Sequence, residues 1–185
     1  MRGAEAADAP QIADIHVRSW QAAYRGMLPD DHLDNLSTDM AQRVQRWQAR
    51  IKRPEPPELV TLVAVPASDR DAVIGWLNYG PARDDDVGPK VGEVWAINVD
   101  PDQWRHGAGA RLLDAGAQYL SQHYEQAVLW VLEANVRARS FYQACGWRAD
   151  GTSRTYGQGA AKAPEVRYRH DLTSYRHDLA AKPNR

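Results

Sequence analysis

Two glycines placed two residues apart are the first feature of this chain that suggests chemistry. Gly107 and Gly109 lie in the stretch QWRHGAGARLL, residues 103–113, after a run typical of a strand and before one typical of a helix. Backbone N–H groups at the start of a helix have no partner within it, and the helix dipole favours negative charge there. Glycine also lets the backbone approach an anion closely. The turn therefore fits a phosphate site, although a plain corner at a helix start fits these two residues as well.

Two common phosphate-binding patterns do not match this turn. A dinucleotide fingerprint needs a third glycine three residues after the second, and this chain has Leu112 there. A P-loop ends in Lys followed by Ser or Thr, whereas here Arg111 precedes Leu112. If the turn binds phosphate, it belongs to a third kind of site.

The elements that must position this turn follow from hydrophobic spacing and turn residues. The predicted helices are 9–24, one from about 38 onward, 107–123 and 136–146, and the predicted strands are 59–65, 72–80, 91–99, 126–133 and 164–172. The first two strands indicate an antiparallel hairpin, and the apolar run 126–133 indicates a central strand covered on both faces. KRPEPPE, residues 52–58, is interpreted as a linker within the domain. The fold class expected is α/β of the α+β type, with a mixed, mainly antiparallel central sheet flanked by helices.

Two longer blocks resemble the signature motifs of the GNAT superfamily of acyl-CoA N-acyltransferases. GEVWAINVDPDQWRHGAGARLL is similar to that family's strand, Arg/Gln-x-x-Gly-x-Gly/Ala turn and helix, which hold a pyrophosphate. LEANVRARSFYQACGW resembles its second block, matched by Asn135, Ala138, Phe141, Tyr142, Gly146 and Trp147. ADIHVRSWQAAYRGMLPDDHLD resembles the opening helices of bacterial members, and EVRYRHDL resembles their closing strand. The resemblance covers about residues 2–172 and implies a GNAT-like fold that binds acetyl-CoA as the acyl donor.

The resemblance also implies which residues face the acetyl-CoA. They are Ile97, Asn98, Val99, Arg105, His106, Gly107, Ala108, Gly109, Ala110, Asn135 and Tyr142. The backbone of Asn98 and Val99 would pair with the pantetheine arm and offer a donor to the acyl carbonyl. Asn135 would bond this arm or cap the helix that follows it.

Two positions depart from the family pattern. Trp104 stands where the family usually has Arg or Gln, and Arg105 stands where a glycine is common. A left-handed backbone costs a non-glycine residue about 1–2 kcal/mol. Arg105 therefore has either ordinary dihedral angles or a strained backbone, and its guanidinium, with His106 beside it, can reach a phosphate.

Two residues are the candidates for catalysis of acyl transfer to an amine. An alkyl amine with a pKa of about 10.4 is almost fully protonated at neutral pH, so a base that takes the proton helps by ~10²–10⁴. Glu93 is the proposed general base, because it lies in the strand that leads to the turn and the resemblance implies a base at this strand position. Tyr142 would hydrogen-bond the leaving thiolate. The alternatives are a solvent-facing carboxylate for Glu93 and a packing residue for Tyr142.

Other residues carry weaker signals. Trp20, Tyr24 and Trp76 form either core or the wall of the acceptor site. The run Asp84–Asp86 either attracts a cationic amine or is a solvated loop. Cys145, at a helix end with no His near it in sequence, is expected to be a small buried core residue rather than a nucleophile.

Composition excludes several classes of protein. The 185 residues include 23 basic and 24 acidic side chains and sum to a charge of −1, which argues against a nucleic-acid partner. No apolar run resembles a signal peptide or spans a membrane, so we expect a cytoplasmic protein without a membrane partner. The single cysteine fits a reducing compartment, and the six histidines show no metal-ligand spacing, so no metal is expected.

The sequence thus predicts one acetyl-CoA-dependent N-acetyltransferase domain over residues 1–172 that acts on the primary amine of a small molecule or peptide. Residues 173–185 are expected to form a flexible tail, in which YRHDL occurs a second time. A homodimer is compatible with the sequence. Two alternatives stay open: a non-catalytic CoA-binding or ligand-sensing module on the same fold, and a nucleotide-binding regulatory protein whose glycine turn holds a different phosphate.

Overall fold

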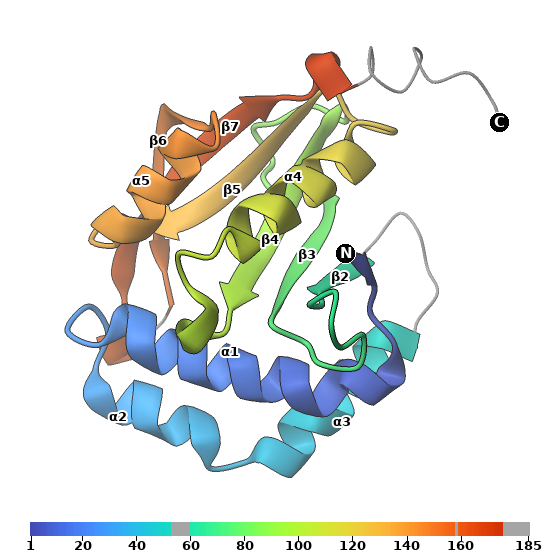
Figure 1. Ribbon diagram of the computed structural model, residues 1–185. Coiled ribbons are helices and arrows are strands. Elements are labelled where there is room, and N and C mark those ends of the chain that lie inside the picture. Colours follow the sequence, from blue (N-terminus) through green and yellow to red (C-terminus); the bar gives the residue numbers. More distant parts are fainter. Residues whose placement is uncertain (53–59, 158, 176–185) are drawn as a thin grey trace, which may run out of the picture.

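A seven-stranded sheet organises the protein. The computed structural model describes residues 1–52, 60–157 and 159–175, and the predicted linker lies almost entirely outside these residues. The strands follow the spatial order β1-β2-β3-β4-β5-β7-β6 (Figure 1). Their bounds are Arg2–Gly3 (β1), Val60–Ala64 (β2), Gly75–Pro81 (β3), Val91–Val99 (β4), Gln126–Leu132 (β5), Arg148–Tyr156 (β6) and Ala163–Asp171 (β7). Within this sheet β4 and β5 pair in parallel and the other pairs are antiparallel, which confirms the predicted fold class.

Helices cover both faces of the sheet. They are Ala9–Tyr24 (α1), Asp30–Asp34 (α2), Met40–Lys52 (α3), Ala108–Leu120 (α4) and Val136–Ala144 (α5). In Figure 1, α4 crosses in front of β3 and β4, and α1 and α3 run together along the lower side of the sheet. Helix α4 sits close to the sheet because Gly116 faces Leu77, where a Cβ atom would come within 2.9 Å of a Leu77 methyl carbon.

Burial of apolar side chains explains this layering. The largest cluster joins α4 and α5 to one face of the sheet, with Leu77, Leu112 and Leu129 almost fully buried. A second cluster joins α1 and α3 to the other face through Ile12 and Trp76. Removing a side chain of this size from water contributes about 1.5–3 kcal/mol.

Most predicted elements are confirmed, and two short ones and one long edge strand were missed. Helix 9–24 and strand 91–99 have the predicted bounds, and the hairpin of the first two predicted strands is antiparallel. The missed elements are β1, α2 and β6. Strand β6 lies at the sheet edge and exposes most of its residues, so it lacks the alternation of polar and apolar residues that indicates a strand.

The chain stays packed on the core beyond the predicted domain boundary. Leu172, the last residue of the predicted domain, is fully buried, and beyond it Tyr175 packs against the main core and its hydroxyl donates a hydrogen bond of 3.0 Å to Oδ1 of Asp114. The first YRHDL copy lies in β7 and the residue after it. The second copy lies outside the described residues after Tyr175.

A bulge in β4 lies where β4 and β5 stop pairing. Along β3 the pairing partner shifts from Val94 to Ala96, which leaves Trp95 as an extra residue. A bulge bends its strand and increases the local twist. The parallel pairing with β5 ends at the same point, since Val94 and Leu129 form its last pair. The later residues of both strands instead line a cavity between them.

Candidate active site

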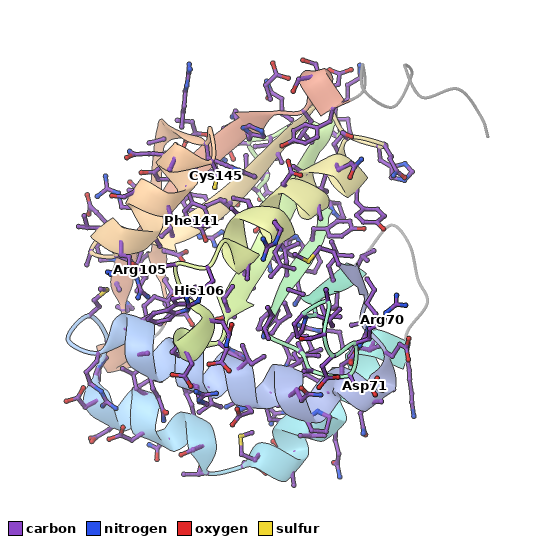
Figure 2. The ribbon with its side chains drawn as sticks, viewed as in Figure 1. Arg70, Asp71, Arg105, His106, Phe141 and Cys145 are labelled. Carbon is purple, nitrogen blue, oxygen red and sulfur yellow. The ribbon has the colours of Figure 1, made fainter. Side chains whose placement is uncertain are left out.

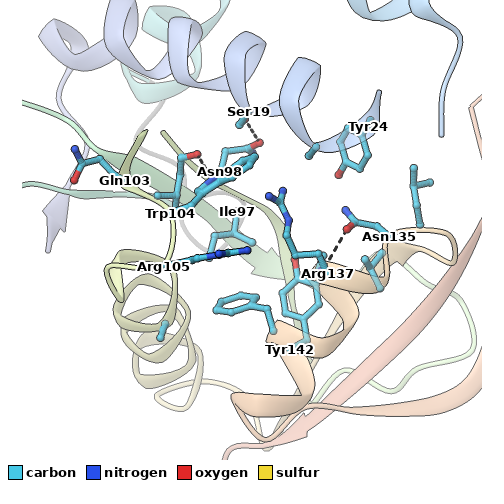
Figure 3. A pocket seen from close by; sticks show the side chains of 18 of the residues that line it. Ser19, Tyr24, Ile97, Asn98, Gln103, Trp104, Arg105, Asn135, Arg137 and Tyr142 are labelled. Atoms are coloured by element: carbon cyan, nitrogen blue, oxygen red, sulfur yellow. Dashed lines mark hydrogen bonds between the residues drawn. The ribbon is translucent and has the colours of Figure 1, made fainter. Parts of the chain in front are cut away.

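The cavity between the diverging strands has a volume of about 490 Å³. Its walls come from β4, β5, α1, α5 and the turn before α4 (Figure 3). It collects most of the residues that the sequence proposed for acetyl-CoA: Ile97, Asn98, Val99, Arg105, Gly107, Gly109, Ala110, Asn135 and Tyr142. Two proposed residues do not line it: Ala108 is buried in the core, and His106 is exposed on the turn (Figure 2).

The turn before α4 has a left-handed backbone at two positions. Gly107 has φ of +79°, which glycine adopts without cost, but Arg105 has φ of +67°. Of the two alternatives for Arg105, the structure thus has the strained one, at a cost of about 1–2 kcal/mol. Within the described chain, the backbone N–H groups of residues 105–110 have no hydrogen-bond partner. The turn therefore presents a row of free donors at the start of a helix, as an anion site requires.

Two asparagines on the cavity wall are held by hydrogen bonds. Oδ1 of Asn98 accepts a bond of 2.7 Å from the Ser19 hydroxyl, which ties α1 to β4. Oδ1 of Asn135 accepts a bond of 3.0 Å from the backbone N–H of Ala138 and caps α5. Asn135 thus caps α5, one of the two roles considered for it, and it also lines the cavity.

Two phenols face the cavity from opposite elements. Tyr142 of α5 and Tyr24 of α1 both line it, and neither hydroxyl has a hydrogen-bond partner among the described residues (Figure 3). Burial, followed by the nearby Tyr24, raises the pKa of Tyr142 above its ordinary value. Burial likewise raises the pKa of Tyr24 to about 12, with Tyr156 and Glu165 adding to the effect. Both phenols are therefore neutral hydrogen-bond donors at physiological pH.

Glu93 lies outside the cavity wall, in an ion pair. Its side chain is 1% exposed, so it does not face solvent. Arg83 donates to it three times, from Nη2 to Oε1 (2.6 Å) and from Nε and the backbone N to Oε2 (3.1 and 3.0 Å). The Arg83 guanidinium also stacks over the Trp95 ring at 4.5 Å. Both Glu93 oxygens are occupied by Arg83 in this arrangement.

The three aromatic residues proposed for the acceptor wall lie in different parts of the structure. Tyr24 lines the cavity, while Trp20 packs behind it with ring centres 5.0 Å apart. Trp76 is 1% exposed and packs against Trp47 and His16, so it belongs to the core between α1, α3 and the sheet. Burial is the main reason that the pKa of His16 falls to about 4, as expected in such an interior.

The acidic run lies in a largely exposed loop, but two of its carboxylates are bound by arginine. Asp84 and Asp86 both accept hydrogen bonds from the Arg167 guanidinium, at 3.1 and 2.7 Å. Arg154 and the Trp130 indole N–H bind Asp84 as well. The run thereby ties its loop to β5, β6 and β7.

Comparison with known proteins identifies the family. The model of the Acetyltransferase (GNAT) family matches residues 12–147. The uncharacterized N-acetyltransferase YuaI of Bacillus subtilis is 32% identical over 145 residues, 78% of this chain and 77% of that protein. A probable N-acetyltransferase of Mycobacterium tuberculosis, Rv2775, is 26% identical over 170 residues, 91% of each chain.

The chain belongs to the GNAT family of acetyltransferases. Its fold agrees: the PaiA N-acetyltransferase of Thermoplasma acidophilum, solved in complex with coenzyme A, superimposes with a TM-score of 0.71. At 15% identity this match covers 92% of this chain and 96% of that one.

Within this GNAT chain, Trp104, one of the two residues that depart from the family turn, contacts β4 and α5. The Trp104 indole N–H donates to the Val99 carbonyl at 2.8 Å, and the Arg137 guanidinium of α5 lies 3.7 Å from the centre of its ring. Burial, followed by the charge of Arg105, lowers the pKa of Arg137 from its usual value. Neither arginine forms a salt bridge within the described residues. Arg105 and Arg137 thus bring two uncompensated positive charges to one end of the cavity.

Sequence reasoning missed several residues of the GNAT cavity, chiefly Arg137, Trp130 and Glu165. Arg137 lies inside the second motif, and its place in the first turn of α5 was the one available signal. Trp130 and Glu165 lie in predicted strands, where nothing in the sequence told which face they use.

Cys145 packs against the main core and is partly exposed rather than buried. Burial, followed by the charge of Asp114, raises the pKa of its thiol, which disfavours a nucleophilic thiolate. No helix of the described chain is both long and apolar enough to cross a bilayer.

Proposed function

We propose that this GNAT chain transfers an acetyl group from acetyl-CoA to a primary amine, which attacks the thioester directly. The observation that carries the proposal is the cavity itself, because it joins a turn of free backbone donors to two neutral phenols. The coenzyme A bound by the PaiA neighbour supports the choice of donor. When bound, acetyl-CoA supplies an acyl group activated as a thioester.

The residues at the basic end of the cavity fit the phosphates of such a donor. The free N–H groups of residues 105–110, the start of α4 and the charges of Arg105 and Arg137 all favour an anion. Binding of phosphate would also satisfy donors that have no partner in the described chain. This gain is the proposed compensation for the strained backbone of Arg105.

Tyr142 is proposed to hydrogen-bond the sulfur that leaves. Its raised pKa favours a phenol that stays protonated, so it is suited to donate to a thiolate as negative charge develops. Full proton transfer from a phenol to a thiolate is uphill, because the ordinary pKa values are about 10 and about 8.5. A hydrogen bond is therefore the proposed role.

Glu93 is proposed to accept the proton of the amine, under a condition that the ion pair imposes. Because the Arg83 side chain binds both oxygens, Glu93 becomes available only when that side chain moves aside, and Oε2 still keeps its bond from the Arg83 backbone N–H. The Arg83 side chain is 52% exposed and can rotate toward solvent. We thus propose that Glu93 acts as a base only while the Arg83 side chain is turned away from it.

Thermal unfolding in the presence of ligands tests the proposed donor. A ligand at 100 times its dissociation constant adds about 2.7 kcal/mol of stability. We expect acetyl-CoA to raise the melting temperature, and ATP and NAD at the same concentration to leave it unchanged. Stabilisation by ATP or NAD alone would overturn the proposal in favour of a nucleotide-binding protein.

Release of free thiol then tests catalysis. With acetyl-CoA and a panel of primary amines, we expect thiol to appear in proportion to acetylated amine. Stabilisation by acetyl-CoA with no amine-dependent thiol release would support the alternative, a CoA-binding module that senses a ligand.

A further inference from the structure

The charged residues that line the cavity are unevenly distributed. Arg105 and Arg137 contribute positive charge from the turn and from α5, and Glu165 contributes a carboxylate from β7. Among the described lining residues these three are the ones with ionisable acidic or strongly basic side chains. A cavity that is cationic at one wall and anionic at another suits two ligands of opposite charge.

The Glu165 carboxylate keeps hydrogen-bonding capacity toward the cavity. The residue is 7% exposed and sits on β7 opposite Leu132, another residue of the wall. Its Oε2 accepts a bond of 2.9 Å from Nε of Arg154, and the described structure holds no other hydrogen bond to this carboxylate. A carboxylate has about four acceptor positions, so one Arg154 donor leaves most of them open.

The surroundings of Glu165 favour a cationic group. Tyr24 lines the cavity with it and presents an aromatic ring, whose face attracts cations, whereas the Trp130 ring is already covered by the Arg154 guanidinium at 4.0 Å. Tyr24 stays neutral because its pKa is raised to about 12, chiefly by burial. The other nearby acidic side chains, Asp84 and Asp86, are already bound by Arg167. Glu165 is therefore the carboxylate that this cavity can offer to a ligand.

We infer that Glu165 binds an ammonium group of the acceptor and selects amines that carry a second cationic group. This inference rests on the proposed function. The attacking nitrogen must lose its proton, and a carboxylate beside it would hold it in the charged form. A second ammonium that stays charged throughout the reaction gains from Glu165 without this cost. Glu165 thus acts on substrate specificity, and proton removal is left to another group.

Three acceptors of similar length test the inference: 1,4-diaminobutane, 4-amino-1-butanol and 4-aminobutanoate. Their far ends are positive, neutral and negative, so they vary the charge offered to Glu165. In the parent protein we expect kcat/KM to fall in that order. In Glu165→Gln we expect kcat/KM for the diamine to fall about 10- to 100-fold, as for loss of a charged hydrogen bond, with most of the change in KM. The value for aminobutanol should fall by a smaller factor, because its hydroxyl can donate a hydrogen bond to Glu or to Gln and loses no ion pair.

Matched controls separate specificity from folding. Gln at position 165 keeps an oxygen that accepts from Arg154, so the melting temperature should stay close to that of the parent. Glu133→Gln makes the same change at an exposed residue beyond the end of β5 that does not line the cavity, and it should preserve the order of the three acceptors.

Two results would overturn the inference. One is a parent protein that does not rank the three acceptors by charge, including one that turns over none of them. The other is a Glu165→Gln variant that keeps the parent's ranking. Either result, in a protein that is stabilised by acetyl-CoA and acetylates other amines, removes the role of Glu165 and leaves the proposed function standing. Absence of acetyl-CoA binding would instead remove the proposed function.

Discussion

Two glutamates of the central sheet, each beside an arginine, are used differently. Glu93 on β4 and Glu165 on β7 are both buried, with exposures of 1% and 7%. Arg83 occupies both oxygens of Glu93, whereas Arg154 binds one oxygen of Glu165. Glu165 lines the cavity and Glu93 does not.

The difference shows that residue type and burial do not by themselves decide what a carboxylate can do. Removal of one partner from a closed buried pair leaves an uncompensated charge. A carboxylate with open acceptor positions at a cavity can exchange water for a ligand. The pair Arg83–Glu93 therefore stabilises the fold whether or not Glu93 takes part in catalysis. In the pair Arg154–Glu165, the carboxylate keeps acceptor positions that a ligand can use.

The largest expected effect is on stability, and it compares the two arginines. Arg83→Gln should lower the free energy of unfolding by up to about 3 kcal/mol, because Glu93 stays buried and keeps only the bond from the backbone N–H of residue 83. Arg154→Gln should cost about 1 kcal/mol or less, because Glu165 can be hydrated from the cavity and Arg154 is 39% exposed. Urea unfolding of both variants measures the difference, and equal losses would mean that the two pairs are energetically alike.

Glu93→Gln tests whether the covered carboxylate also acts as a base. We expect turnover to fall ~10²–10³-fold at pH 7. The loss should shrink as the pH rises toward the amine's own pKa of about 10.4, because free amine then no longer needs to be generated. Turnover measured against pH in both proteins checks this. Normal turnover at pH 7 would assign the Arg83–Glu93 pair to structure and the proton to another group or to water.

Tyr142→Phe tests the departure of the thiolate, a step in which neither glutamate is proposed to take part. We expect turnover to fall about 10- to 100-fold, the effect of losing one hydrogen bond to a charged group. Since the pKa of Tyr142 is raised, its phenol stays protonated through mildly alkaline pH, so this loss should not recover there as in Glu93→Gln. Acetyl-CoA affinity should stay within about tenfold, because the bond forms mainly in the transition state. Tyr119→Phe, at an exposed tyrosine on α4, is the matched control.

Arg105→Asn gives the smallest expected effect. It tests the backbone strain at Arg105 and the contribution of its positive charge to acetyl-CoA binding. Asn adopts the left-handed backbone more readily, so the free protein should gain up to about 1 kcal/mol of stability. Loss of the guanidinium should weaken acetyl-CoA binding by a few fold. Unfolding with and without acetyl-CoA measures both. Weaker stability of the free variant would mean that the turn does not store strain at Arg105.

Local sequence determined the parts of the protein that depend on local physics. Residues 9–24 and 91–99 were predicted as a helix and a strand with the observed bounds, since turn residues at their ends and local residue preferences define both segments. The glycine spacing around Gly107 and the motif at Asn135–Tyr142 predicted two walls of one cavity and the family to which the chain belongs. Strand β6 was missed because an exposed edge strand has little hydrophobic pattern to detect.

Tertiary structure decided which side chains meet. Val94 and Val99, five residues apart on β4, both pack into the core on the side of α4, which strict alternation along a strand does not allow. The bulge at Trp95 changes the alternation between them, so the face used by Glu93 could not be extrapolated from the residues near the turn. The closure of Arg83 on Glu93 and the opening of Glu165 to the cavity both depend on contacts between strands. Local propensity and spacing do not specify such contacts, because they form only when the sheet is assembled and β4 separates from β5.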